Sequence, residues 1–116
     1  MYKYKKKILI DLDGVLNDYA GNYDEKNIPP LKDGAEEFLK ELNKTAELYL
    51  FTARNLLMTS KWLKKNGIDI YFSDITNIKI PAFLYIDDRA INFKGDYKNM
   101  LKEISEFKPY WNNLNT

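Results

Sequence analysis

An apolar run that leads directly into two carboxylates is the feature that most constrains this chain of 116 residues. Residues 8–12 are short, apolar and rich in β-branched side chains, which is typical of a strand buried on both faces. Asp11 and Asp13 stand at the end of this run, and Gly14 follows them. Desolvated anions at the end of a buried strand repel each other unless a cation lies between them. The run therefore predicts a divalent metal and a phosphate-handling reaction at this end of the strand.

The composition restricts the kinds of site that the chain can build. There is no cysteine and no histidine, which excludes disulfides, thiol catalysis and the commonest general base. A metal site must then be built from oxygen ligands, and oxygen ligands favour Mg²⁺ over Zn²⁺ or Cu²⁺. The net charge of +1 gives no general attraction to nucleic acid. No apolar run has the length of a membrane span or a signal peptide, so we expect a cytoplasmic protein without a membrane partner.

The length corresponds to a single domain, residues 1–116, in which strands alternate with helices. Strands are predicted at 8–12, 48–51, 68–72 and 82–86, and helices at about 34–43, 56–65 and 97–108. Asp33 and Asp96 are the predicted N-caps of the first and last helices. The inward positions are predicted to be Ala35, Phe38, Leu39 and Leu42 in the first helix, and Leu56, Trp62 and Leu63 in the second. The pattern indicates an α/β fold, a Rossmann-like three-layer α/β/α sandwich with a mainly parallel sheet.

Polar residues follow three of the predicted strands. Thr52 and Arg54 come after the second strand, and Asp87 and Asp88 come after the fourth. Because the carboxyl ends of parallel strands lie along one edge of a sheet, these side chains should meet Asp11 and Asp13 in one crevice. Four carboxylates in one crevice need a hard cation among them. Lys79, just before the fourth strand, adds a positive charge on the same side.

Each of these groups has a use in phosphoryl transfer. One carboxylate can attack phosphorus, and a second can protonate the leaving oxygen and later activate water. Mg²⁺ offsets the mutual repulsion of the anions, and hydroxyl and ammonium groups bind the remaining phosphoryl oxygens. The guanidinium groups of Arg54 and Arg89 suit phosphate, but Arg54 could equally pair with one of the carboxylates. Thr52, Lys79 and the Asp88–Arg89 pair also have ordinary structural interpretations, as a strand end, a solvated lysine and a local ion pair.

In their order along the chain, these residues resemble the four motifs of the haloacid dehalogenase (HAD) superfamily of phosphotransferases. The motifs are Asp11-Leu12-Asp13-Gly14-Val15, Thr52, Lys79 and Asp87-Asp88. The resemblance implies that Asp11 is the nucleophile and that Asp13 is the general acid and base. It also implies a Mg²⁺ site made by Asp11, the backbone carbonyl of Asp13, and Asp87, with Asp88 acting through water. Dehalogenases of the superfamily lack an acid at the position of Asp13, so the resemblance is to its phosphatases.

The same resemblance assigns the phosphate-binding and peripheral residues. Thr52 and Lys79 are implied to bind the phosphate, with Ala53 expected beside Thr52. From their chemistry and position, Gly14, Arg54 and Arg89 are expected to line its surroundings. The segments between the motifs are too short for a cap domain, which resembles the capless class of the superfamily. Such enzymes often act on large substrates or take a lid from a partner subunit, so a homo-oligomer that shields the open site is one expected partner.

The expected function is therefore a Mg²⁺-dependent phosphomonoester hydrolase that works through an aspartyl-phosphate on a small or macromolecular substrate. Two alternatives stay open. One is a nucleotide or nucleic-acid-end phosphatase, and the other is a non-catalytic phosphorylation switch or Mg²⁺-binding module that resembles a receiver domain. Specificity should reside in the loop of residues 18–31, which Asn17 and Asp18 help to shape. The aromatic residues near the termini are predicted to pack against the sheet; they are Tyr2, Tyr4, Tyr110 and Trp111.

Overall fold

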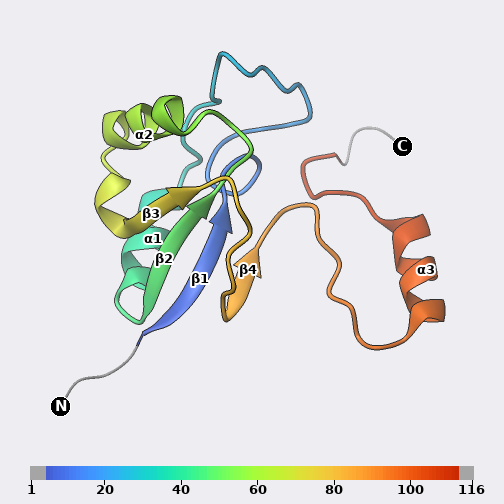
Figure 1. The fold of residues 1–116 in the computed structure, drawn as a ribbon. Helices are drawn as coiled ribbons and strands as arrows, with labels where there is room; N and C mark the ends of the chain where they lie inside the picture. Colours follow the sequence, from blue (N-terminus) through green and yellow to red (C-terminus); the bar gives the residue numbers. More distant parts are fainter. Residues whose placement is uncertain (1–4, 113–116) are drawn as a thin grey trace.

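The computed structural model describes residues 5–112, so Tyr2 and Tyr4 lie outside the described residues. The elements in chain order are β1 (Lys6–Asp11), α1 (Ala35–Asn43), β2 (Ala46–Phe51), α2 (Leu56–Lys65), the 3₁₀ helix η1 (Asp69–Tyr71), β3 (Phe72–Thr76), β4 (Leu84–Ile86) and α3 (Tyr97–Glu106). The strands form one parallel sheet in the order β3-β2-β1-β4, shown in Figure 1. The Rossmann-like α/β fold with a parallel sheet is thus confirmed.

One face of the sheet carries the hydrophobic core. Successive side chains of a strand point to opposite faces, so alternate residues of β1 and β2 reach this face together. Its buried members from the strands and the two helices are Ile8, Ile10, Leu48, Leu50, Leu39 and Leu63. The connections β1-α1-β2 and β2-α2-β3 both step in the same direction along the sheet, and crossovers of one hand then place both helices on one face. We call this the covered face.

The other residues of the same strands form the second face. Leu9 of β1 is in register with Tyr49 of β2 and with Tyr85 of β4, and Phe51 is the next residue of β2 on this side. Tyr85 is 40% exposed, and Tyr49 and Phe51 are half-buried. The remaining helix, α3, lies beyond β4 in Figure 1, and none of its residues is buried. We call the surface of Leu9, Tyr49, Phe51 and Tyr85 the second face.

The helix predictions are confirmed where a side chain caps the first turn. α2 spans Leu56–Lys65 as predicted, because the Asn55 side chain accepts from the Met58 amide at 3.0 Å. Gly67, at φ +70°, follows the helix as its predicted stop. Asp96 caps α3 and accepts from the amides of Lys98 and Asn99.

Some local predictions are wrong. Gly34, at φ +88°, is the N-cap of α1 in place of Asp33, and no side chain caps that helix. The third strand begins at Phe72, because residues 69–71 form η1 and the buried Ile68 packs into the core before the strand starts. Phe38 and Leu56 were predicted to point inward but are 43% and 38% exposed. Among residues 5–112, no helix has both the length and the apolar character needed to cross a membrane.

Candidate functional site

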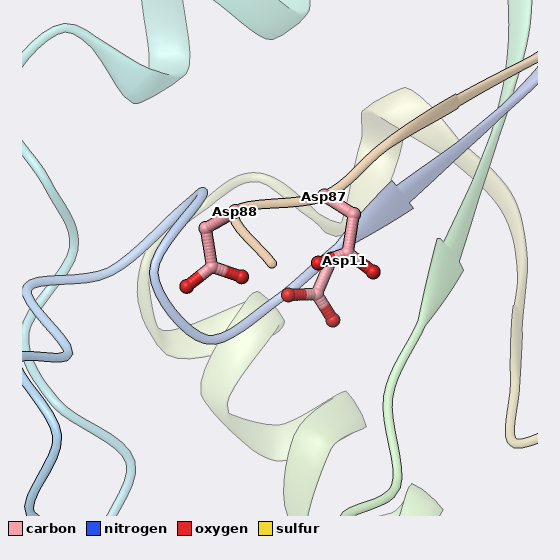
Figure 2. A group of neighbouring side chains, drawn as sticks. All are labelled: Asp11, Asp87 and Asp88. Carbon is pink, nitrogen blue, oxygen red and sulfur yellow. The ribbon is translucent and has the colours of Figure 1, made fainter. Parts of the chain in front are cut away.

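The carboxylates of Asp11, Asp87 and Asp88 come together at the carboxyl edge of the sheet (Figure 2). Asp11 is the last residue of β1, and Asp87 and Asp88 directly follow β4. β1 and β4 are hydrogen-bonded neighbours with Ile10 opposite Ile86, so the residues that follow these two lie side by side. One carboxylate oxygen from each aspartate lies within 4.8 Å of the others. We call these three residues the acidic cluster.

The surroundings of Asp11 oppose its ionisation. Burial raises the pKa of the Asp11 carboxyl to about 8, and the nearby charges of Asp87, Asp88 and Asp13 and a hydrogen bond with Asp88 add to the rise. A cation among the carboxylates would reverse this effect by favouring the charged form. The cluster offers only oxygen donors, which is the donor set that Mg²⁺ prefers. The residues present therefore fit a hard divalent ion.

The carboxylate of Asp13 is held by Arg54 and not by the acidic cluster. Arg54 Nε donates to Asp13 Oδ2 at 2.9 Å, and Arg54 Nη2 donates to Asp13 Oδ1 at 3.1 Å. The amide of Asn17 donates to the same Oδ1 at 3.0 Å. Two parallel N–H···O bonds from a guanidinium fix both the position and the plane of a carboxylate. Asp13 is thus held rigidly beside the cluster.

Arg54 is buried and links three parts of the site. Its Nη1 donates to the Asp24 carbonyl oxygen at 2.8 Å, and its guanidinium lies 4.5 Å from the centre of the Tyr23 ring. The sequence left open whether Arg54 binds phosphate or pairs with a carboxylate, and the structure shows the pairing with Asp13. Arg54 also ties the 18–31 loop, where specificity was expected, to the end of β2.

The loop after β1 is shaped by Asn17, as predicted. Its Oδ1 accepts from the amides of Gly14 and Tyr19, each at 3.1 Å, and the side chain is fully buried. Gly14 has φ +83°, and a Cβ at this position would collide with the carboxylate of Asp88. Glycine is therefore needed both for the backbone conformation and for the close approach of Asp88.

The predicted phosphate-binding residues lie around the cluster. Thr52 is buried, and its hydroxyl oxygen accepts from the Arg54 amide at 3.1 Å. Ala53 lines a hollow of about 450 Å³ together with Arg54 and Tyr23. Lys79 lies over the Tyr85 ring, 4.4 Å from its centre, and shares a smaller hollow with Asp11 and Asp87. Thr52 directly follows β2, the neighbour of β1, and Lys79 shares a hollow with Asp11, so both lie at the sheet edge of Asp11.

A second open hollow, of about 310 Å³, contains the acidic residues themselves. Its wall combines carboxylates, aromatic rings and a guanidinium; the residues are Asp11, Asp13, Asp87, Asp88, Tyr19, Tyr23 and Arg89. Arg89 donates to the Tyr19 hydroxyl at 3.2 Å and does not pair with Asp88. The two tyrosines come from the 18–31 loop and were not singled out in the sequence, because aromatic residues in a polar loop carry no spacing signal.

The C-terminal segment reaches the site, which the sequence did not predict. Trp111 Nε1 donates to Asp88 Oδ2 at 2.5 Å, and the Tyr110 hydroxyl donates to the Gly14 carbonyl oxygen at 2.6 Å. The Trp111 ring meets Tyr19 edge-on at 5.1 Å between ring centres. The prediction that Tyr110 and Trp111 pack on the sheet is therefore wrong, because these hydrogen bonds draw both residues to the loop after β1.

Comparison with known proteins identifies the fold but not the activity. No protein-family model matches the chain, and no curated protein matches it. A solved structure of a conserved protein from Bacteroides thetaiotaomicron is similar, with 22% sequence identity and a TM-score of 0.60. The match covers 97% of this chain and 99% of that one. The parallel α/β arrangement is thus shared over nearly the whole length of both chains.

Proposed function

We propose that this chain is a Mg²⁺-dependent phosphomonoesterase that works through an aspartyl-phosphate on Asp11. The observation that carries the proposal is a partly buried carboxyl at the end of a parallel strand, packed against two further carboxylates. Ligands of open α/β sheets bind at this edge. The resemblance of the four sequence motifs to those of the HAD superfamily supports the same activity.

Asp11, Asp87 and Asp88 are the side chains that would hold the metal, and the backbone carbonyl of Asp13 is the further ligand that the resemblance implies. When bound, Mg²⁺ would offset the repulsion among the carboxylates and draw negative charge from the phosphoryl oxygens. The Thr52 hydroxyl has no acceptor among residues 5–112, so its proton is available to a phosphoryl oxygen. The Lys79 ammonium, which lines a hollow together with Asp11, would bind another oxygen.

In the first step, a carboxylate oxygen of Asp11 forms a bond to phosphorus while the bond from phosphorus to the leaving oxygen breaks. The electron pair of that bond goes to the leaving oxygen, which takes a proton from Asp13 and departs as the alcohol. In the second step, Asp13 accepts a proton from water as the water oxygen attacks phosphorus. The bond between phosphorus and Asp11 then breaks, which releases inorganic phosphate and restores both carboxyl groups.

Arg54 acts in this proposal as a positioning residue for Asp13. Its bidentate contact keeps the Asp13 carboxyl next to Asp11 while leaving it on the wall of the hollow that contains the cluster. Correct placement of a proton donor contributes to the rate because proton transfer requires hydrogen-bond reach to the leaving oxygen. The substitution Arg54→Lys would keep the positive charge but lose the bidentate contact with the Asp13 carboxylate.

The proposal is tested by hydrolysis of p-nitrophenyl phosphate with and without Mg²⁺. We expect turnover that needs the metal and falls by about 10³-fold or more in Asp11→Asn, because loss of a nucleophile removes the covalent route. Asp33→Asn is the matched control, since Asp33 is exposed and caps no helix. Retained turnover in a folded Asp11→Asn variant would refute the nucleophile assignment. An inactive wild-type protein that also fails to bind beryllofluoride would refute the activity.

A nucleotide is the second candidate substrate, because aromatic rings line the hollow beside the cluster. Tyr19 and Tyr23 both contribute to that wall, and planar bases stack on such rings. A panel of a 5′-nucleotide, a sugar phosphate and a 5′-phosphorylated oligonucleotide separates the substrate classes. A phosphorylated Asp11 that persists for hours, without turnover, would instead favour the phosphorylation-switch alternative.

A further inference from the structure

Arg89 carries a guanidinium at the site that makes no ion pair among residues 5–112. The other arginine of the chain, Arg54, is bound to Asp13 through both Nε and Nη2. Arg89 Nη2 donates to the Tyr19 hydroxyl at 3.2 Å, whereas Arg89 Nε and Nη1 donate to no acceptor in the described part of the chain. A guanidinium has five N–H donors. Arg89 therefore keeps its charge and most of its donors for a ligand.

Two aromatic rings hold the Arg89 guanidinium in place without adding a negative charge. Its carbon lies 4.9 Å from the centre of the Trp111 ring and 5.8 Å from that of the Tyr19 ring. The backbone amide of Arg89 also donates to Asp87 Oδ1 at 2.8 Å, which fixes the chain at this residue. Ring faces attract and orient a cation. A cation that is already oriented loses little side-chain freedom when it binds an anion, which favours binding.

Arg89 lines two hollows of opposite electrostatic character. One is the hollow of about 310 Å³ that contains the acidic cluster. The other has a volume of about 370 Å³ and lies between the 18–31 loop and the C-terminal segment, with a wall that includes Asn22, Phe107 and Trp111. Arg89 is the one charged side chain among the described residues that line this second hollow. We call it the Arg89 hollow, and its charge favours an anion.

The hollow at Ala53 does not offer the same attraction. Its charged lining residues are Glu25, Lys26 and Arg54, and Arg54 is already paired with the Asp13 carboxylate. Glu25 and Lys26 carry opposite charges, so this hollow presents no unbalanced positive charge. Of these two hollows beside the acidic cluster, the Arg89 hollow is the one that suits a negatively charged group.

We propose that the preferred substrate is a phosphomonoester whose alcohol carries a second oxyanion, a carboxylate or a further phosphate, and that Arg89 binds this oxyanion in the Arg89 hollow. The inference rests on the proposed phosphatase activity and specifies its substrate class. A guanidinium suits both oxyanions, because its paired N–H groups bind two oxygens at once. Arg89 is then a specificity-determining residue, which selects the alcohol and takes no part in the making or breaking of bonds.

The first test compares three phenyl phosphates that differ only in the para substituent. The p-carboxyphenyl and p-phosphonophenyl esters carry an oxyanion, and the p-carbamoylphenyl ester is the neutral isostere of the first. For each anionic ester, kcat/KM is divided by that of the neutral ester. We expect this ratio to fall by about tenfold in Arg89→Gln for the preferred anionic ester, because a hydrogen bond to a charged group has about this effect on binding. The ester with the larger fall identifies the preferred oxyanion.

Lys40→Gln is the matched control for the loss of one positive charge. Lys40 is exposed in the last turn of α1, so this substitution should leave both ratios unchanged. Comparison with the wild type cancels the different chemical reactivities of the esters. Ratios that do not change in Arg89→Gln would overturn the proposal, whether the rates are unaffected or fall equally for all three esters.

The second test detects binding without turnover, so it separates this inference from the proposed activity. The chain has two arginines, so a ¹⁵N spectrum in mildly acidic buffer has two side-chain Nε–H signals, which Arg89→Gln assigns. In Asp11→Asn with Mg²⁺, the preferred anionic ester should shift the Arg89 signal, and the neutral ester should leave it in place. The Arg54 signal is the internal reference and should respond alike to both esters, because its Nε is bonded to Asp13.

The two tests together distinguish failure of this inference from failure of the proposed activity. An Arg89 signal that shifts only with an anionic ester, in a protein whose wild type hydrolyses none of the three, would keep the oxyanion site and refute the phosphatase. Hydrolysis of the esters with no shift of the Arg89 signal would keep the phosphatase and overturn the oxyanion site.

Discussion

Asp11 connects the packing of the site to its chemistry. Its carboxyl follows a buried strand and faces two further carboxylates, so its pKa is raised to about 8. The free protein therefore holds a proton on the group that the proposed reaction needs in its charged form. A bound cation would remove that proton by stabilising the carboxylate. Metal binding and proton release from Asp11 are expected to be coupled.

The first prediction concerns stability against pH without metal. The pKa of Asp11 is about 8 in the folded protein and 3.8 in the unfolded chain, so between these values the folded state binds the extra proton. Its contribution to stability is greatest below pH 4 and is lost as the pH rises to about 8. The loss is on the order of a few kcal/mol at most, since water still reaches part of the carboxyl.

Thermal melts in EDTA across this range test the prediction. Asp11→Asn should remove the part of the pH dependence that Asp11 causes, and should be more stable than the wild type above pH 8. Mg²⁺ should raise the melting temperature of the wild type at pH 8 and have much less effect on the variant. Asp33→Asn provides the control. Parallel melting curves for wild type and Asp11→Asn at every pH would contradict the assignment.

The second prediction concerns Gly14, whose missing side chain makes room for Asp88. Gly14→Ala strains a backbone at φ +83° and pushes the Asp88 carboxylate out of the acidic cluster. We expect a destabilisation of about 1 kcal/mol or more, together with weaker Mg²⁺ binding in calorimetry. Gly34→Ala is the matched control, because Gly34 has φ +88° and nothing within 4 Å of the added methyl group. Equal Mg²⁺ affinity in both variants would contradict the steric argument.

At this scale, the sequence predicted the residues that strand ends bring together and missed those that arrive through loops. Asp11 and Asp87 could be brought together in advance because the carboxyl ends of parallel strands lie along one edge, and the structure shows that β1 and β4 are neighbours. The partner of Arg54 could not be chosen, since a guanidinium suits phosphate and carboxylate equally. Trp111 was missed because its contact with Asp88 spans the whole segment that contains α3 and leaves no trace in the spacing of the sequence.

The site residues are positioned by the ends of the strands and helices. α2 begins two residues after Arg54, and the side chain of Asn77 donates to the carbonyl oxygens of Thr52 and Arg54 at 2.6 and 3.0 Å. The turn between β2 and α2 is thus fixed from both sides. This turn positions the guanidinium that holds Asp13.

The third prediction tests the cap of α2. Asn55→Ala removes the bond to the Met58 amide and should cost about 1 kcal/mol of unfolding free energy. Asp33→Ala should cost much less, because Asp33 precedes α1 without capping it. Chemical denaturation of both variants measures the difference. Equal losses would show that the Asn55 side chain stabilises its helix no more than Asp33 does, contrary to the structure.

Element boundaries were predicted well where a cap or a glycine marks them, as at Asn55, Gly67 and Asp96. They were predicted poorly at β3, because apolar residues 68–72 suit a buried turn and a strand equally well. Ile68 is fully buried, yet it lies before η1 and not in the sheet. The sequence of a short apolar segment fits a buried turn and a strand equally well, and only its tertiary contacts decide between them.

For the whole molecule, the alternation of strands and helices was sufficient to predict the parallel sheet and the edge that carries the site. It was not sufficient to predict where α3 lies. The spacing of Tyr97, Leu101 and Ile104 predicts an apolar side of α3, but it does not say where the helix lies. That information depends on the contacts at the two ends of the segment.

The fourth prediction uses the hydrogen bond between Trp111, near the C-terminal end of the described residues, and Asp88. Trp111 bonds to Asp88 in the acidic cluster, whereas Trp62 belongs to α2 and packs against the core of the covered face. If Asp88 turns to a bound cation, its bond to the indole weakens and the ring gains water. Titration with Mg²⁺ should therefore shift the tryptophan emission to longer wavelength. The shift should be lost in Trp111→Phe and kept in Trp62→Phe. A shift that survives Trp111→Phe would place the metal away from Asp88 and separate the C-terminal segment from the site.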